Sequence, residues 1–129
     1  KSKKPVWAGF STRLSDTGLV LSFMEEDDIP FERIVNIVKD FNIDVAGIMH
    51  TDVNAVSESL KVLRNFFDGP LMVYPDSGGW VSPNWDFNKV IQPKQLKSFA
   101  EKWIKEGVNI IGGCCGLSPN HIREIAQLK

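Results

Sequence analysis

An α/β fold with a parallel sheet is the class that this sequence predicts, and two observations indicate it. Short apolar runs rich in strand-forming residues alternate with longer segments whose apolar residues recur at three-and-four spacing. This alternation occurs four times, and strands that alternate with helices form parallel sheets because each helix carries the chain back across the sheet. No linker or low-complexity segment interrupts the chain, so residues 1–129 are expected to form one domain.

Each predicted element has its own local signals. The predicted strands are residues 6–10, 45–49, 71–74 and 108–111. The predicted helices are residues 31–41, 53–67, 93–107 and 119–128. Proline stands where three of these helices begin, at positions 30, 93 and 119, because its missing N–H costs nothing in the first turn. Gly69 and Pro70 end the second helix, and Ser118 is the expected N-cap of the last one.

Two irregular segments are candidates for function. Residues 75–92 form a long loop with Trp80 and Trp85, and loops of this length are commonly binding loops, although aromatic residues also pack loops onto a surface. Residues 112–116 (GGCCG) form a turn directly after a strand and before a helix. The carboxyl ends of parallel strands are where such folds place their active sites.

Composition and charge exclude several classes of partner. Hydrophobic residues make up 43% of the chain and charged residues 24%, which is typical of a globular protein. The net charge of −1 offers no attraction to nucleic acid or anionic lipid, and no apolar run approaches the roughly 20 residues that span a bilayer. We therefore expect neither nucleic acid nor a membrane as partner. Two cysteines do not make a disulfide framework, so a cytoplasmic location is expected.

The only two cysteines, Cys114 and Cys115, are adjacent. Neighbouring Cα atoms lie about 3.8 Å apart, whereas a relaxed disulfide needs roughly 4.4–6.8 Å, so a bond between them would be strained. That strain, and the absence of C-x-x-C spacing, argue against a redox switch. Flanking glycines allow both thiolates to point at one zinc ion. Two packed thiols without a metal are the alternative.

A family resemblance covers nearly the whole chain. Residues 110–121 (IIGGCCGLSPNH) resemble the signature of the homocysteine S-methyltransferase family, in which GGCCG is followed by a small polar pair, Pro and His. Residues 7–12 (WAGFST), 45–50 (VAGIMH) and 71–79 (LMVYPDSGG) resemble further family blocks in the same order. Members of the family have a complete TIM (β/α)8 barrel. The resemblance therefore implies that residues 1–129 are its C-terminal half, with four parallel βα units.

The resemblance also implies a zinc site with three thiolates, two of which fall on Cys114 and Cys115. The third falls on His50, which is itself a good zinc ligand, and a Cys2His set with one open position suits catalysis. Without a metal, His50 would be a polar residue at a strand end. The implied substrate-binding residues are Tyr74, Asp76, Ser77, Gly112 and Gly113. For Tyr74, a buried ring that caps the strand is an equal alternative, and a structural role is favoured for His121.

The function implied is zinc-dependent methyl transfer from a small methyl donor to the thiol of homocysteine, giving methionine. Three departures from the family bear on it: His50 replaces a cysteine, Asp76 an asparagine and Gly79 a glutamate. A neutral imidazole in place of a thiolate should leave the acceptor sulfur less nucleophilic. The alternative is a catalytically degenerate or truncated barrel half that binds a metal or a partner without methyltransferase activity.

Half a barrel leaves surfaces without partners. Parallel sheets are normally covered on both faces, and open sheet edges favour association. The sequence therefore predicts either a homodimer or pairing with a missing N-terminal half-barrel. Five residues belong to predicted strands whose inner faces need partners: Ala8, Phe10, Ile48, Met72 and Ile110.

Overall fold

The computed structural model describes residues 3–24, 26–81 and 83–128, without the side chains of Trp80 and Val81. Its centre is a four-stranded sheet in the order β1-β4-β5-β8. The strands are β1 (Trp7–Phe10), β4 (Val45–Asp52), β5 (Leu71–Asp76) and β8 (Val108–Ile111), and every neighbouring pair is parallel. The predicted α/β fold with a parallel sheet is confirmed.

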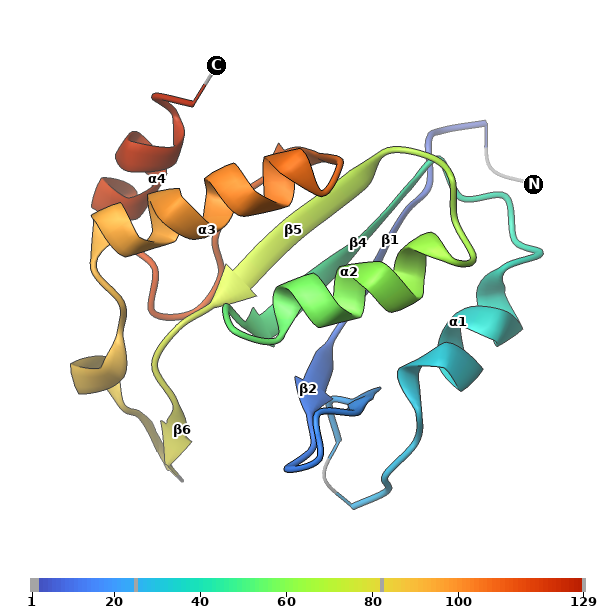
Figure 1. The fold of residues 1–129 in the computed structure, drawn as a ribbon, viewed down its shortest axis with the longest axis horizontal. Coiled ribbons are helices and arrows are strands. Elements are labelled where there is room, and N and C mark those ends of the chain that lie inside the picture. Colours follow the sequence, from blue (N-terminus) through green and yellow to red (C-terminus); the bar gives the residue numbers. More distant parts are fainter. Residues whose placement is uncertain (1–2, 25, 82, 129) are drawn as a thin grey trace.

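The four predicted helices are present, and all but one are clearly shorter than expected. They are α1 (Phe31–Val38), α2 (Val56–Arg64), α3 (Pro93–Lys105) and α4 (Pro119–Ile125). Figure 1 shows α2 and α3 in front of β4 and β5, with α1 and α4 at the two flanks. The prediction that the first helix reaches Phe41 is wrong: the helix ends at Val38 and the Phe41 ring is exposed, so no burial favours extending it.

The hydrophobic core lies between the sheet and these helices. Alternate strand residues, among them Ile48 and Val73, pack against helix residues such as Phe31, Leu60 and Trp103. Their burial removes apolar surface from water, at roughly 25 cal/mol per Å², and this is the main force that holds the helices on the sheet. The core therefore fixes the strand ends where the polar residues lie.

The opposite face of the sheet has a single layer of side chains. Met49 lies over Gly9, and Met72 lies over Gly47 on the neighbouring strand, because these glycines leave the space that a Cβ would fill. Trp7 is 54% exposed and Met49 39% exposed. We call this surface the open face. It is not covered by the described helices, which pack on the other side.

The residues expected to need partners divide between the two faces. Met72 and Ile110 pair with each other in register and lie on the open face. Ala8, Phe10 and Ile48 belong to the helix-covered face, since Ile48 is in the core and pairs with Phe10. The Phe10 ring meets Phe31 of α1 at 5.6 Å between ring centroids, so the helices already cover this end of the first strand.

Two small hairpins were not predicted from the sequence. The first pairs β2 (Thr12–Leu14) with β3 (Val20–Ser22), and the second pairs β6 (Trp80–Val81) with β7 (Asn84–Trp85) before a 3-10 turn at Phe87–Lys89. Strands of two or three residues are too short to show a periodic pattern. Both hairpins extend beyond the carboxyl ends of the main strands.

Among the described residues, no helix is long and apolar enough to cross a membrane.

Candidate metal centre

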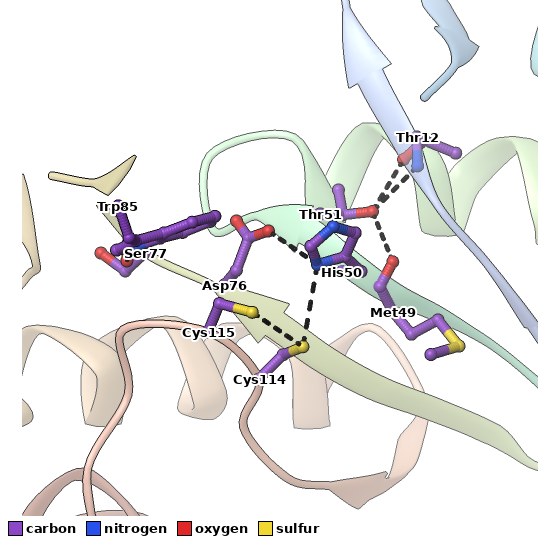
Figure 2. A network of polar contacts seen from close by, with 9 residues as sticks. All are labelled: Thr12, Met49, His50, Thr51, Asp76, Ser77, Trp85, Cys114 and Cys115. Carbon is purple, nitrogen blue, oxygen red and sulfur yellow. Dashed lines mark hydrogen bonds and ion pairs between the residues drawn. The ribbon is translucent and has the colours of Figure 1, made fainter. Parts of the chain in front are cut away.

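Polar side chains from three strands meet at the carboxyl edge of the sheet. Figure 2 shows His50 from β4, Asp76 from β5 and the two cysteines that follow β8 pointing toward one another. The segment that carries the cysteines, residues 112–116, is called the thiol loop below. Parallel strands make this convergence possible because all of them end at the same edge.

Main-chain hydrogen bonds hold the thiol loop beside the end of β5. The N–H of Gly112 donates to the carbonyl of Val73 at 2.9 Å, and the N–H of Cys114 donates to the carbonyl of Pro75 at 2.9 Å. The N–H of Ser77 then donates to the carbonyl of Cys115 at 3.1 Å. The hydrogen bonding between β5 and β8 thus continues past the last strand residue, which places both thiols next to Asp76.

Gly116 ends the thiol loop in a conformation that glycine favours. Its φ is +78°, and a Cβ at this position would meet the carbonyl oxygen of Ser77. The close approach lets the chain turn away into α4. A larger residue would force the loop and the end of β5 apart, so this glycine fixes where the thiols lie.

The ligand atoms of Cys114, Cys115 and His50 all lie within 4.8 Å of one another. The two Sγ atoms are 3.8 Å apart, and Cys114 Sγ is 3.8 Å from His50 Nδ1. Tetrahedral zinc, with bonds of about 2.3 Å to sulfur and about 2.0 Å to nitrogen, separates two sulfurs by about 3.8 Å and a sulfur from a nitrogen by about 3.6 Å. The donor types and the two spacings from Cys114 therefore fit zinc, while Cys115 and His50 lie within 4.8 Å of each other.

His50 has an unusual backbone conformation. Its φ is +47°, and it is the only residue other than glycine with a positive φ in the described part of the chain. The pairing of β4 with β5 is irregular between Met49 and Asp52, so the strand changes direction around His50. The ring of Phe23, just after β3, lies 4.8 Å from the imidazole between centroids. The histidine is thus contacted from both the sheet and the first hairpin.

Asp76 borders the same group of atoms. Its Oδ2 is 3.4 Å from His50 Nδ1, and the residue is only 7% exposed. Burial raises the pKa of this carboxyl above its ordinary value, the charge of His50 lowers it, and the nearby Asp52 raises it. A cation at the site would favour the ionised carboxylate beside it.

The thiol of Cys115 has a pKa above its ordinary value. Burial raises its pKa above the ordinary value, and the neighbouring Cys114 and the carboxylate of Asp76 raise it further. Since a metal ligand must be the thiolate, binding of a cation here requires that protons leave.

The comparison with known families decides the relationship. A family model described as homocysteine S-methyltransferase matches residues 1–128. The chain belongs to this family. It is 37% identical to homocysteine S-methyltransferase 2 of Arabidopsis thaliana over 127 residues, which are 95% of this chain and 36% of that protein. Homocysteine S-methyltransferase 1 of Saccharomyces cerevisiae is 31% identical over 132 residues, 96% of this chain and 39% of that protein.

The solved structures agree with the fold. The metallated form of the homocysteine methyltransferase MmuM from Escherichia coli superposes with a TM-score of 0.67 at 23% identity, and the match covers 98% of this chain and 36% of that one. This chain of the homocysteine S-methyltransferase family thus spans just over a third of the length of the relatives it matches.

The residues predicted to bind substrate have different surroundings. Tyr74 is half-buried and its ring lies against Gly112, while Gly113 packs near Leu117. Ser77 is 1% exposed: its Oγ accepts from the N–H of Ile91 at 2.9 Å and its carbonyl accepts from the indole of Trp85 at 3.1 Å. Ser77 therefore holds the long loop in place, and a contact with substrate stays a prediction for all of these residues.

His121 is structural, as the sequence favoured. Its Nδ1 accepts from the N–H of Ser118 at 3.0 Å, so Nε2 carries the proton and donates to the carbonyl of Ile91 at 2.7 Å. The ring is buried beneath the start of α4. The Trp85 ring packs near the end of β5, while the side chain of Trp80 lies outside the described residues.

A cleft of about 810 Å³ opens between the two hairpins, and its lining includes Asp76 but neither the cysteines nor His50. Among the described lining residues, Glu26, Asp52 and Asp76 supply carboxylates, and Arg13 supplies a cation that is itself paired with Asp28 at 2.5 Å. The cleft therefore carries an excess of negative charge. Sequence reasoning did not single out Asp52, because an aspartate after a predicted strand is common. Its role shows only once the fold places it near Asp76.

Proposed function

We propose that this chain provides the metal-binding and acceptor-binding half of an enzyme that transfers a methyl group to the thiol of homocysteine, giving methionine. The observation that carries the proposal is the convergence of Cys114, Cys115 and His50 within 4.8 Å at the carboxyl edge of the sheet. Membership of the homocysteine S-methyltransferase family supports the reaction class.

Zinc is the cofactor that we propose for these three residues, since two sulfurs and an imidazole nitrogen are ligands that it prefers. When bound, zinc lowers the pKa of a thiol and so supplies a thiolate nucleophile at neutral pH. His50 replaces a thiolate with a neutral imidazole, so the ligand set has one negative charge fewer. We expect the acceptor sulfur to be less nucleophilic as a result.

The cleft between the two hairpins, which reaches the candidate metal centre at Asp76, is the proposed binding place of the amino acid and of the methyl donor. Its carboxylates attract the ammonium group of homocysteine. Two of them, Asp52 and Asp76, are the last residues of β4 and β5. Gly79 lines the same cleft without a side chain, so it contributes no charge there. Tyr74 pairs with Met49 of the open face and its ring lies against Gly112, whereas Gly113 faces Leu117 and Ile122.

We also propose that residues 1–129 form the C-terminal half of a TIM barrel and act together with a second half. The open face, the two free edges at β1 and β8 and the length of the relatives all support this. The other half is a second copy of this chain or an N-terminal half-barrel. Size-exclusion chromatography with light scattering tests the homodimer, and a stable, well-folded monomer would contradict it.

Metal analysis and a methylation assay test the function. Protein purified without chelators should hold close to one zinc per chain, and Cys114→Ser should lose it. Formation of methionine from homocysteine should depend on the same residue. The second candidate is a degenerate half that binds zinc without activity, and the replacements at His50, Asp76 and Gly79 favour it. Zinc binding without methylation, in the presence of the other half, would decide for this candidate.

A further inference from the structure

The conformation of His50 needs an explanation that the metal site alone does not give. A residue other than glycine is disfavoured at positive φ because its Cβ comes close to the backbone, and bonds elsewhere must hold it there. If this residue relaxed to an extended conformation, the imidazole would point away from Cys114. The neighbours of His50 therefore decide whether its Nδ1 faces the thiol loop.

Thr51 bridges the backbone on both sides of His50. Its hydroxyl donates to the carbonyl of Met49 at 2.9 Å, so the bond spans the strained residue. The same oxygen accepts from the N–H of Thr12, the first residue of β2, at 3.0 Å. Figure 2 shows both bonds on the side of His50 away from the cysteines.

The hydrogen bonds continue from Thr12 to Ser59, and the donor in each bond of this hydroxyl chain (Thr51, Thr12 and Ser59) can be assigned. The hydroxyl of Ser59, on α2, donates to the carbonyl of Ala55 at 2.9 Å, and the proton of Thr51 already goes to Met49. The hydroxyl of Thr12 therefore donates to Ser59 Oγ, 2.7 Å away, rather than to Thr51 at 3.3 Å. Each hydroxyl donates once, and none is left without a partner.

Burial makes this chain hard to replace with water. Thr12 is 1% exposed, and Thr51 and Ser59 are 0% exposed. A group of this kind that loses its partner stays desolvated and unpaired, which is costly. The three residues come from β2, β4 and α2, so the bonds connect the first hairpin, the sheet and the helical layer at one point.

The first hairpin contacts His50 a second time through Phe23. Thr12 pairs in register with Ser22, and Phe23 is the next residue after that pair. One strand of the hairpin therefore bonds to Thr51 behind the histidine, while the chain leaving the other strand places the Phe23 ring on the imidazole. The backbone and the ring of His50 are fixed by the same short hairpin.

We propose that the β2–β3 hairpin positions His50 as a ligand, through the hydroxyl chain of Thr12, Thr51 and Ser59 and through the ring of Phe23. Thr51 is the central positioning residue, since its hydroxyl donates to the carbonyl of Met49, before His50, and accepts from the N–H of Thr12 in the hairpin. The inference rests on the proposed function only in taking the imidazole to be a metal ligand. It adds that the ligand is held in place before any cation arrives.

The test compares Thr51→Val, which keeps the shape and removes the hydroxyl, with Thr51→Ser, which keeps the hydroxyl. Affinity for Co²⁺ alone is measured by its absorption bands in each variant and in His50→Ala. Residues that orient a ligand typically change metal affinity about 10- to 100-fold when replaced. We expect that loss in Thr51→Val, and an affinity for Thr51→Ser close to that of the unchanged chain.

A double-mutant cycle separates positioning from a general loss of structure. In the His50→Ala background, Thr51→Val should cause no further loss of Co²⁺ affinity, because the residue that it positions is gone. An equal loss in both backgrounds, or no loss in a folded Thr51→Val variant, would overturn the inference. If the valine variant does not fold, Phe23→Leu, which leaves the hydroxyl chain intact, is carried through the same cycle with the same criteria.

A metal-free measurement keeps this inference distinct from the proposed function. In the chain without metal, a nuclear Overhauser effect is expected between the His50 ring and the β-protons of Cys114, and it should disappear in Thr51→Val but not in Thr51→Ser. A chain that binds no cation but shows this pattern would overturn the proposed function and the ligand role of His50, while the positioning of the ring by the hairpin would stand. A chain that binds Co²⁺ equally well with and without the hydroxyl would sink the positioning role alone.

Discussion

The two sides of the candidate metal centre are held in place by different means. The thiol loop takes its position from main-chain hydrogen bonds to β5 and from the close approach of Gly116 to Ser77. His50 takes its position from side chains, namely the Thr51 hydroxyl and the Phe23 ring. The difference teaches that the thiols depend on backbone conformation, whereas the imidazole depends on the chemistry of its neighbours.

Gly116→Ala should have the largest effect on this comparison. The added Cβ meets a carbonyl oxygen at a residue with φ of +78°, so we expect destabilisation by about 2–4 kcal/mol and displacement of both thiols. Urea unfolding measures the change. Gly79→Ala is the matched control, because nothing lies within 4 Å of its Cβ, and it should change stability by no more than about 0.5 kcal/mol.

Cys114→Ser and Cys115→Ser should come next, with an effect on metal binding rather than on folding. We expect each to lower affinity for Zn²⁺ by about 100-fold or more, since one of the three ligands is lost. Stability without metal should change by less than about 1 kcal/mol. Competition with a chromophoric chelator measures the affinity. Unchanged affinity in either variant would show that the corresponding sulfur is not a ligand.

Acid should weaken Zn²⁺ binding in a way that sharpens the distinction between thiols and imidazole. Burial and the neighbours of Cys115 raise the pKa of its thiol, so at neutral pH the proton must leave when the cation binds. Affinity should therefore rise with pH, and titration calorimetry in buffers of different ionisation enthalpy should detect released protons. In Cys115→Ser fewer protons should be released. Binding without any proton release would contradict thiolate ligation.

Asp76→Asn should have the smallest effect, and it should stabilise the metal-free chain rather than destabilise it. Burial raises the pKa of this carboxyl in the folded chain, so the folded state favours the neutral form and ionisation destabilises it. The destabilisation is absent in acid and develops as pH rises through the folded pKa. Asp76→Asn should therefore raise the Tm of the metal-free chain slightly at neutral pH, with little change in acid. Thermal unfolding at several pH values checks both.

Much of the framework could be predicted because it follows local patterns. The strand runs and the helix periodicity predicted the parallel sheet, whereas Cys114, Cys115 and His50 were predicted as a set from the resemblance of the GGCCG and VAGIMH segments to the family. The hairpins at Thr12–Leu14 and Trp80–Val81 gave no such signal, since they are too short to show periodicity. Helix ends were also predicted poorly, because they depend on which residues find a core to pack against.

The sequence by itself determined which chemical groups this chain can offer: two adjacent thiols flanked by glycine and an imidazole at a strand end. Only the tertiary structure decided that they meet, because residues 50, 76 and 114 come together through a parallel sheet whose strands all end at one edge. It also decided that Thr12, Thr51 and Ser59 form one buried chain. The bond from the N–H of Thr12 to the Thr51 hydroxyl spans 39 positions, and the bond between the hydroxyls of Thr12 and Ser59 spans 47, so both depend on packing, which no local pattern contains.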